Sequence, residues 1–119
     1  MEINKQGFWG EIFAVRYMRD RGYVPVTINF RSRVGEIDIV AVKDGYICFT
    51  EVKTRGPNSI AQPKEAVDTE KQQNIIAASK IFARAHPYTE QPRFDVCEVY
   101  LDENMKPTQI NYIENAFNG

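Results

Sequence analysis

The sequence contains few of the residues on which several common protein classes depend. Among its 119 residues, only Cys48 and Cys97 are cysteines, and His86 is the single histidine. The two cysteines lie far apart, each inside a strand-like segment, which disfavours a zinc knuckle or a disulfide framework. We therefore expect both cysteines in the core and His86, beside Pro87, in a loop.

The sequence also lacks a long hydrophobic run and a strong net charge. No apolar segment approaches the roughly 20 residues that span a bilayer, and residues 1–21 are amphipathic without a signal-peptide core. We therefore expect a cytoplasmic protein without a membrane partner. A net charge of −1 argues against a basic coat for nucleic acid. However, residues 1–35 hold six of the fifteen Lys and Arg but only three of the sixteen Asp and Glu, which is compatible with a local basic rim.

The hydrophobic pattern predicts a single domain over residues 1–119 with the element order αβββαβ and a further short strand. The segments are a helix over 3–21, a strand over 23–30, a hairpin over 35–55, a loop over 55–63, a helix over 64–85, and strands over 93–101 and 109–117. Within the second helix, Asp68 or Thr69 could cap a break. Four aromatic residues are expected in the core rather than on a base-stacking platform: Trp9, Phe13, Tyr17 and Tyr23.

This order predicts an α/β fold in which an antiparallel meander is followed by a helical crossover and a fourth strand. Both faces of the hairpin are apolar, which favours a mixed sheet flanked by helices on both faces. We expect one face to carry Ile37, Ile39, Cys48 and Val52, and the other to carry Val40, Val42, Ile47 and Phe49.

The hairpin has a well-defined turn signal that sets its pairing. Asp44-Gly45 is typical of a two-residue type I′ turn, because both central positions need positive φ. Counting outward from this turn places Asp38 opposite Glu51 and Glu36 opposite Lys53. Because side chains alternate along a strand, these four side chains are predicted to project from one face at the open end of the hairpin.

Two carboxylates in this position need a cation nearby. At about 4 Å and an effective dielectric of about 20 they repel by roughly 4 kcal/mol, which is large against the stability of a small domain. Lys53 alone would give a structural salt-bridged cluster, which is one interpretation of the pattern. A divalent cation compensates the charge better, and Asp and Glu oxygens favour Mg²⁺ or Mn²⁺ over zinc.

The sequence resembles the PD-(D/E)XK nuclease signature of the restriction-endonuclease-like superfamily, with Asp38 followed by a hairpin and then by Glu51-Val52-Lys53. Over nearly the whole chain the sequence is similar to the bacterial YraN-like family of proteins labelled as endonucleases by similarity. The similar segments are "GEIFAVRYMRDRGY", "NFRSRVGEIDIV", "FTEVKTR", "EAVDTEKQ", "RFDV" and "IENAF". One departure is Ile37, which stands where the superfamily pattern has a proline that is not a metal ligand.

The resemblance implies a restriction-endonuclease-like αβββαβ core and a metal-dependent nuclease. Asp38 and Glu51 would hold Mg²⁺ or Mn²⁺, the backbone carbonyl of Val52 would complete the metal shell, and Lys53 would contact the attacking water. Such a cation polarises the phosphate, activates bound water and neutralises developing charge.

Further residues have weaker assignments. Glu11 falls on the apolar side of the first helix, where a carboxylate needs a partner. Related junction-cleaving nucleases are similar in placing a first-helix Glu at the metal, which implies that Glu11 is an additional ligand, directly or through water; the alternative is a partly exposed residue paired with an arginine. Glu36 either orients Lys53 or is solvated. Lys71 and Gln72 resemble residues lining the superfamily's cleft, although a solvated helix face is the more common position for such residues. Four other residues complete the set: Arg31, Arg33 and Arg55 as phosphate contacts or surface charge, and Asp95 as a salt-bridge or site-supporting residue.

The sequence thus predicts a Mg²⁺- or Mn²⁺-dependent nuclease that acts on DNA, with branched, structured or single-stranded DNA as candidate substrates. The main alternative is a nucleic-acid-binding or partner-binding module that keeps the fold without turnover, which the near-neutral charge favours. A purely structural acid cluster is the third interpretation. Many nucleases of this architecture are homodimers, but no interface motif in the sequence supports a dimer.

Overall fold

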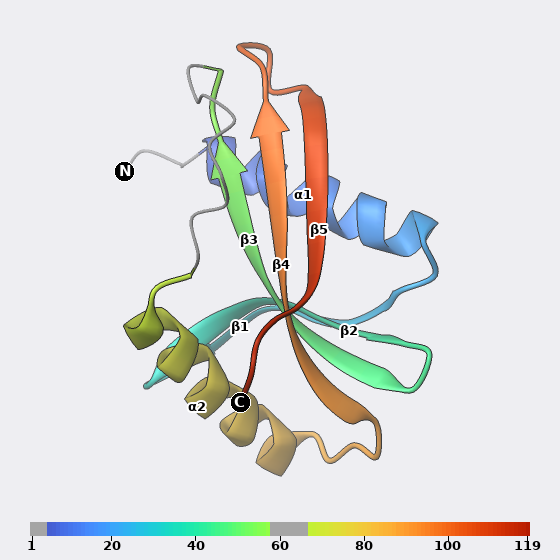
Figure 1. The fold of residues 1–119 in the computed structure, drawn as a ribbon, viewed down its shortest axis with the longest axis vertical. Coiled ribbons are helices and arrows are strands. Elements are labelled where there is room, and N and C mark those ends of the chain that lie inside the picture. Colours follow the sequence, from blue (N-terminus) through green and yellow to red (C-terminus); the bar gives the residue numbers. More distant parts are fainter. Residues whose placement is uncertain (1–4, 58–66) are drawn as a thin grey trace.

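The computed structural model describes residues 5–57 and 67–119, which form two helices and a five-stranded sheet (Figure 1). The elements are α1 (Lys5–Asp20), β1 (Val24–Ser32), β2 (Gly35–Lys43), β3 (Tyr46–Arg55), α2 (Thr69–Ala85), β4 (Gln91–Leu101) and β5 (Pro107–Phe117). The predicted element order is confirmed. Neither helix in the described ranges is long and apolar enough to cross a membrane.

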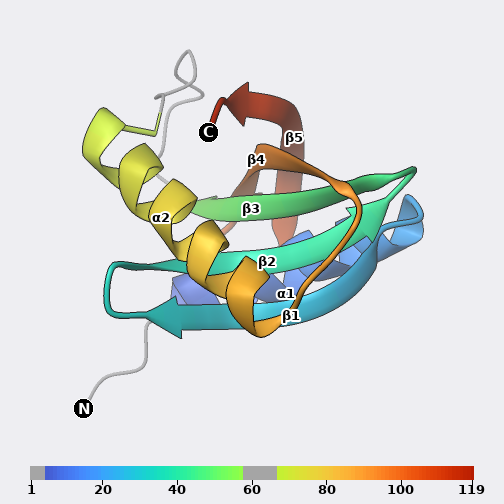
Figure 2. The same ribbon diagram turned by 90° about the horizontal axis from the view of Figure 1, so that it is seen from below.

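The sheet is mixed, with the strand order β1-β2-β3-β4-β5. Strands β1, β2 and β3 form an antiparallel meander, β4 pairs parallel to β3, and β5 pairs antiparallel to β4. Helix α2 makes the crossover that the parallel pair requires, because parallel neighbours cannot be joined by a tight turn. The two helices cover opposite faces of the sheet (Figure 2). The α/β architecture is therefore confirmed, and it is consistent with a restriction-endonuclease-like core.

Helix α2 begins later than the hydrophobic pattern predicts. Asp68 is its N-cap, and the Asp68 carboxylate accepts a 2.8 Å hydrogen bond from the backbone N–H of Lys71. Such a cap accepts a hydrogen bond from one of the otherwise unpaired backbone N–H groups of the first turn, which is why the helix begins directly after Asp68. Residues 3–4 of the first predicted helix, 64–66 of the second and most of the predicted loop lie outside the described residues.

The hairpin between β2 and β3 has the predicted turn. Asp44 and Gly45 both have positive φ, 51° and 83°. The predicted register holds from Lys43↔Tyr46 as far as Ile39↔Thr50. There the pairing ends, so the expected direct opposition of Asp38 to Glu51, and of Glu36 to Lys53, is wrong. The physical reason lies in the side chain of Asp38, which takes up a backbone N–H of β3 just beyond the last pair.

Two apolar clusters lie on the two faces of the sheet. Val40, Val42, Ile47 and Phe49 pack under α2, whereas Ile39, Cys48 and Val52 pack under α1, as predicted. Both cysteines are buried and free. Ile37 was predicted beside Ile39 but belongs to the cluster under α2. The strict alternation of β2 therefore breaks between Ile37 and Val40, where the pairing with β3 ends.

The N-terminal half of α1 is less buried than its apolar spacing suggests. Tyr23 is buried, and Phe13 and Tyr17 are half-buried, but Trp9 is 36% exposed and its neighbour Phe8 is 53% exposed. The expectation that Trp9 belongs to the core is therefore wrong. The buried face of α1 consists of the small or flexible residues Gly10, Ala14 and Met18, which let the helix lie close to the sheet and leave the larger rings at its edge.

Candidate functional site

The candidate site lies at the end of the β2–β3 hairpin distant from its turn. Asp38 comes from β2, and its Oδ2 accepts a 2.8 Å hydrogen bond from the backbone N–H of Val52 on β3. This bond fixes one carboxylate oxygen of Asp38 against the strand that carries Glu51. The other oxygen keeps its acceptor capacity, since an ionised carboxylate offers about four lone-pair positions.

Glu51 is buried, and its positive partner comes from α2. The Lys71 Nζ lies 2.8 Å from Glu51 Oε1, with the Glu51 side chain 7% exposed and that of Lys71 49% exposed. The hydrogen bond to Glu51 raises the pKa of Lys71, so the ammonium stays charged. The sequence suggested that Lys53 would be the neutralising group. The structure shows instead that α2 brings a cation to this acid.

Lys53 is half-buried on β3, two residues after Glu51. The ladder between β3 and β4 is unbroken from Tyr46↔Gln91 to Arg55↔Tyr100. Because this stretch of strand is regular, Glu51 and Lys53 project from the same side of the sheet. The second acid and the lysine of the Glu51-Val52-Lys53 motif therefore share one face.

Glu11 reaches this region from α1 because Gly10 lets the helix approach β3 closely. A β-carbon at Gly10 would collide with the side chain of Thr54. Glu11 Oε1 is buried, and it is the only such side-chain atom in the described part of the chain without a hydrogen-bond partner. Burial raises the pKa of Glu11, as do the charges of Glu36 and Glu51, whereas Arg31 lowers it.

Glu11, Asp38 and Glu51 are called the acid cluster below. Within it, burial is the main effect that raises the pKa of Asp38 to about 7, and the negative charges of Glu51 and Glu11 raise it further. The hydrogen bond from Val52 and the charge of Lys71 act in the opposite direction but do not compensate. The acid cluster therefore has a shortage of positive charge at neutral pH.

The donor atoms of the acid cluster suit a hard cation, though not as a complete cage. In residues 5–57 and 67–119, no group of three or more His, Cys, Asp or Glu is arranged to hold a metal ion. Mg²⁺ usually binds one or two carboxylates and keeps several waters, so a complete protein cage is not required. Asp38 and Glu51, with the unpartnered oxygen of Glu11 nearby, fit this pattern.

The remaining predicted site residues are placed differently. Glu36 is exposed and lies next to Arg31, with 3.7 Å between Glu36 Oε2 and Arg31 Nε. The Gln72 Nε2 donates a 2.7 Å hydrogen bond to the carbonyl of Val67, so it holds the segment before α2. The other two predicted phosphate contacts differ in exposure: Arg33 is exposed, and Arg55 is half-buried at the end of β3.

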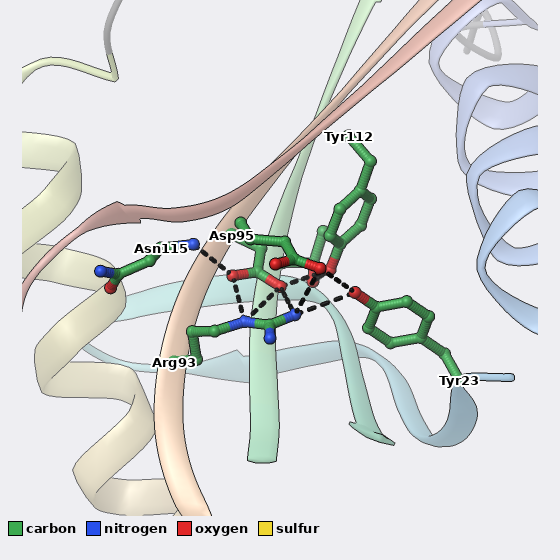
Figure 3. A network of polar contacts seen from close by, with 7 residues as sticks. Tyr23, Arg93, Asp95, Tyr112 and Asn115 are labelled. Atoms are coloured by element: carbon green, nitrogen blue, oxygen red, sulfur yellow. Dashed lines mark hydrogen bonds and ion pairs between the residues drawn. The ribbon is translucent and has the colours of Figure 1, made fainter. Parts of the chain in front are cut away.

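A second buried acid, Asp95 on β4, stands at the centre of a network that the sequence did not predict (Figure 3). Arg93 Nε and Nη2 each donate a 2.9 Å hydrogen bond to the Asp95 carboxylate. The Tyr112 hydroxyl donates at 2.6 Å, and the backbone N–H of Asn115 at 2.9 Å. Arg93 also donates to the Tyr23 hydroxyl at 2.9 Å.

The Asp95 network joins the start of β1 to β4 and β5. Asp95 is completely buried and has four donors, so the salt-bridge interpretation is the one that the structure supports. The only local signal is that Arg93 and Asp95, two residues apart in a strand, share a face. Tyr23 and Tyr112 are far away in the sequence, which is why the network could not be predicted.

Comparison with known proteins agrees with the resemblance seen in the sequence. A family model described as "Uncharacterised protein family UPF0102" matches residues 10–99. A UPF0102 protein of Alkaliphilus oremlandii is 42% identical over 119 residues, covering 97% of this chain and 100% of the relative. One from Caldanaerobacter subterraneus subsp. tengcongensis is 39% identical over 120 residues, covering 98% of each. One from Caldicellulosiruptor bescii is 39% identical, covering 98% of this chain and all of the relative.

The matched range contains every member of the acid cluster together with Lys53, Lys71 and Asp95. The match spans most of the chain, and the relatives align with it over nearly their full length. The chain therefore belongs to the UPF0102 family, which is the YraN family that its sequence resembles.

Proposed function

We propose that this protein is a divalent-cation-dependent nuclease that hydrolyses phosphodiester bonds in DNA, with Asp38 and Glu51 as the ligands of Mg²⁺ or Mn²⁺. One observation carries the proposal: the buried Glu51 carboxylate and the half-buried Asp38 carboxylate, on adjacent strands, lie beside an unpartnered Glu11 oxygen, and their charge is not fully compensated. A buried acid group of this kind is costly unless a cation joins it. A cytoplasmic location is part of the proposal.

The residues of the chain have distinct roles in this proposal. The backbone N–H of Val52 holds Asp38 in place, while its carbonyl is a further candidate ligand. Lys71 orients the Glu51 carboxylate through their ion pair until the cation arrives. Lys53, on the same face as Glu51, contacts the attacking water and offsets charge that develops on the phosphate. The bound cation supplies polarisation of the phosphate and a lower pKa of the water.

Arginines near the site are suited to hold the DNA backbone. Arg31 and Arg33 are exposed at the turn between β1 and β2, and Arg55 ends β3. Phosphate contacts of this type position the nucleic acid without reading its sequence. This cationic rim would let a chain with a net charge of −1 bind DNA locally.

The test is a cleavage assay with Mg²⁺ or Mn²⁺ on branched, nicked, single-stranded and duplex DNA. At least one substrate should be cut, and Asp38→Asn should abolish the cutting while leaving the fold intact by circular dichroism. Asp20→Asn is the matched control, because Asp20 is an exposed aspartate at the end of α1. Failure to cut any substrate at any cation concentration would refute the enzyme.

A nucleic-acid-binding module without turnover is the second candidate function. It is favoured by the absence, within the described ranges, of a ready-made group of three metal-ligating side chains, and by the near-neutral charge. Salt-dependent DNA binding that persists in Asp38→Asn, without cleavage by the unmodified protein, would select this function.

A further inference from the structure

A groove between α1 and β1 adjoins the acid cluster. It has a volume of about 320 Å³, and Glu11 is one of its lining residues, so the groove and the cluster share a side chain. The walls are largely apolar. They are formed on one side by Phe8, Ile12 and Val15 of α1 and on the other by Ile28 of β1.

The apolar side chains on the two sides of this groove are exposed, including Phe8, the one aromatic residue in its lining. Phe8 is 53% exposed and Ile28 is 47% exposed. Phe8 and Trp9 contact each other edge to face, with 5.6 Å between ring centroids, and Trp9 stacks on Phe13 at 5.9 Å. Large apolar side chains gathered in one hollow of a surface mark a binding site more often than single exposed ones do.

The charge around the groove is positive. Arg16 and Arg19 line it, both exposed, and Arg31 lies near its Glu11 end. An apolar slot that contains one aromatic ring, Phe8, and has arginines at its rim matches the two parts of a nucleotide, a base with a π-face and a phosphate. The complementarity points to a nucleic acid rather than to an apolar peptide.

Pairing with another β-strand is disfavoured at this edge. Pro25 lacks a backbone N–H, the register of β1 shifts between Pro25 and Thr27, and Asn29 has a φ of 57°. Proline, a bulge and a kinked backbone are features that protect an edge strand against a second strand. β1 is indeed an edge strand of the sheet. A ligand at this edge would therefore contact the side chains of β1 and not pair with its backbone.

We propose that this groove binds an unpaired base of DNA, stacked beside Phe8, while Arg16 and Arg19 contact the adjoining phosphates. The inference rests on the proposed function and names its substrate class: DNA with unpaired nucleotides next to the bond that is cut. A base inside a continuous duplex is stacked on its neighbours and cannot enter the groove. Glu11 connects the groove to the acid cluster, which places the scissile phosphate at the groove's end.

Trp9 is the only tryptophan in the sequence and contacts Phe8 edge to face, so its fluorescence reports on the neighbourhood of the groove, although Trp9 is not one of the lining residues. Twelve-nucleotide oligothymidine, titrated in the presence of EDTA, should bind and quench the Trp9 fluorescence, whereas a duplex of equal length should bind more weakly without quenching. Phe8→Ala should weaken oligothymidine binding about fivefold or more, in line with the loss of one base–aromatic stack. Arg16→Gln should weaken it and reduce its salt dependence.

Matched variants separate the groove from general surface effects. Ile28→Ser should weaken binding, while Val24→Ser should not, because Val24 is 64% exposed on the same strand but does not line the groove. Arg84→Gln is the control for Arg16→Gln, since Arg84 is exposed on α2, across the sheet. Absence of quenching would overturn the groove assignment. So would binding of oligothymidine by Phe8→Ala and Ile28→Ser that is as tight as binding by the unmodified protein.

The outcomes distinguish this inference from the nuclease proposal. Quenching that depends on Phe8, without cleavage of any substrate, would uphold the groove and refute the nuclease. Cleavage with kcat/KM unchanged in Phe8→Ala would uphold the nuclease and refute the groove. If the protein instead forms dimers in sedimentation that Ile28→Ser dissociates, the groove binds a second copy of this chain and the inference is wrong.

Discussion

Two regions of the molecule withdraw an aspartate from solvent, Asp95 completely and Asp38 in part, and they surround it in opposite ways. Asp95 has a guanidinium, a tyrosine hydroxyl and a backbone N–H around its carboxylate. Asp38 has one backbone N–H, and its neighbours in the acid cluster are two further acids. A structural carboxylate such as Asp95 is hydrogen-bonded by groups of the same chain. A carboxylate with too few such partners, such as Asp38, needs a bound ligand or ion to compensate its charge.

This difference is the physical argument for a functional site. Burying a charge is tolerable when it is paired and hydrogen-bonded, as at Asp95. At the acid cluster the same cost is only partly offset, by Lys71 and Val52. Such groups concentrate at functional sites because the missing compensation is supplied by a ligand.

The sharpest test of the contrast is the replacement of each aspartate by asparagine. Asp95→Asn leaves Arg93 with a side chain only 12% exposed and without its main partner. Breaking a buried pair in this way costs about 3 kcal/mol, at the lower end of the usual range because Glu114 remains 3.8 Å from Arg93. Urea unfolding at pH 7 measures the loss.

Asp38→Asn is the counterpart and should behave in the opposite direction. The asparagine oxygen still accepts from Val52, and a negative charge is removed from the acid cluster. The free energy of unfolding at pH 7 should therefore be unchanged or higher. Equal losses for the two variants would show that the two aspartates do the same structural work and would remove the contrast.

A second test uses pH. Burial raises the pKa of Asp38 from 3.8 to about 7, so the folded state holds a proton that the unfolded state releases. The stability that this proton supplies is complete below pH 4 and is lost as the pH rises through 7, at up to about 1.4 kcal/mol per pH unit. Urea titrations at several pH values should show this slope in the unmodified protein.

The control for the pH test is Asp38→Asn, in which the loss of stability between pH 4 and 7 should be smaller. Saturating Mn²⁺ should reduce the slope in the unmodified protein too, because a bound cation favours the ionised carboxylate. A variant with the same slope as the unmodified protein would show that another group is responsible.

A third test concerns the close approach that brings Glu11 to the cluster. Gly10→Ala forces a methyl group against Thr54, and we expect a loss of about 1–3 kcal/mol, typical of overpacking. Thr54→Ala in the same protein should restore part of this loss. Stability equal to that of the unmodified protein would show that α1 can shift, and that Gly10 does not set the position of Glu11.

The smallest expected effect concerns Lys71. Lys71→Met removes the ammonium from Glu51, and because Lys71 is half exposed the cost without metal should be below about 1 kcal/mol. Mn²⁺ should then bind somewhat more tightly, since it no longer displaces a charge. Lys80→Met, an exposed lysine of the same helix, is the control. Loss of Mn²⁺ binding in Lys71→Met would contradict the account.

Local signals in the sequence were sufficient for much of the fold. The Asp44-Gly45 pair set the hairpin register, and the apolar spacing on both faces of the strands required two covering helices. They were insufficient where a side chain replaces backbone pairing, as Asp38 does at Val52. They also could not show that Lys71, from the next helix, would neutralise Glu51, or that Trp9 would lie at the surface, because both depend on how the helices pack.

If Asp38 and Glu51 together hold a divalent cation, binding of that cation requires both carboxylates. Isothermal titration of Mn²⁺ tests it most directly, using the unmodified protein, Asp38→Asn, Glu51→Gln and the surface control Asp20→Asn. Heat from a single site is expected in the unmodified protein and in Asp20→Asn, and none in Asp38→Asn or Glu51→Gln. No heat in the unmodified protein, or the same heat in Asp38→Asn, would show that these two carboxylates do not hold the cation.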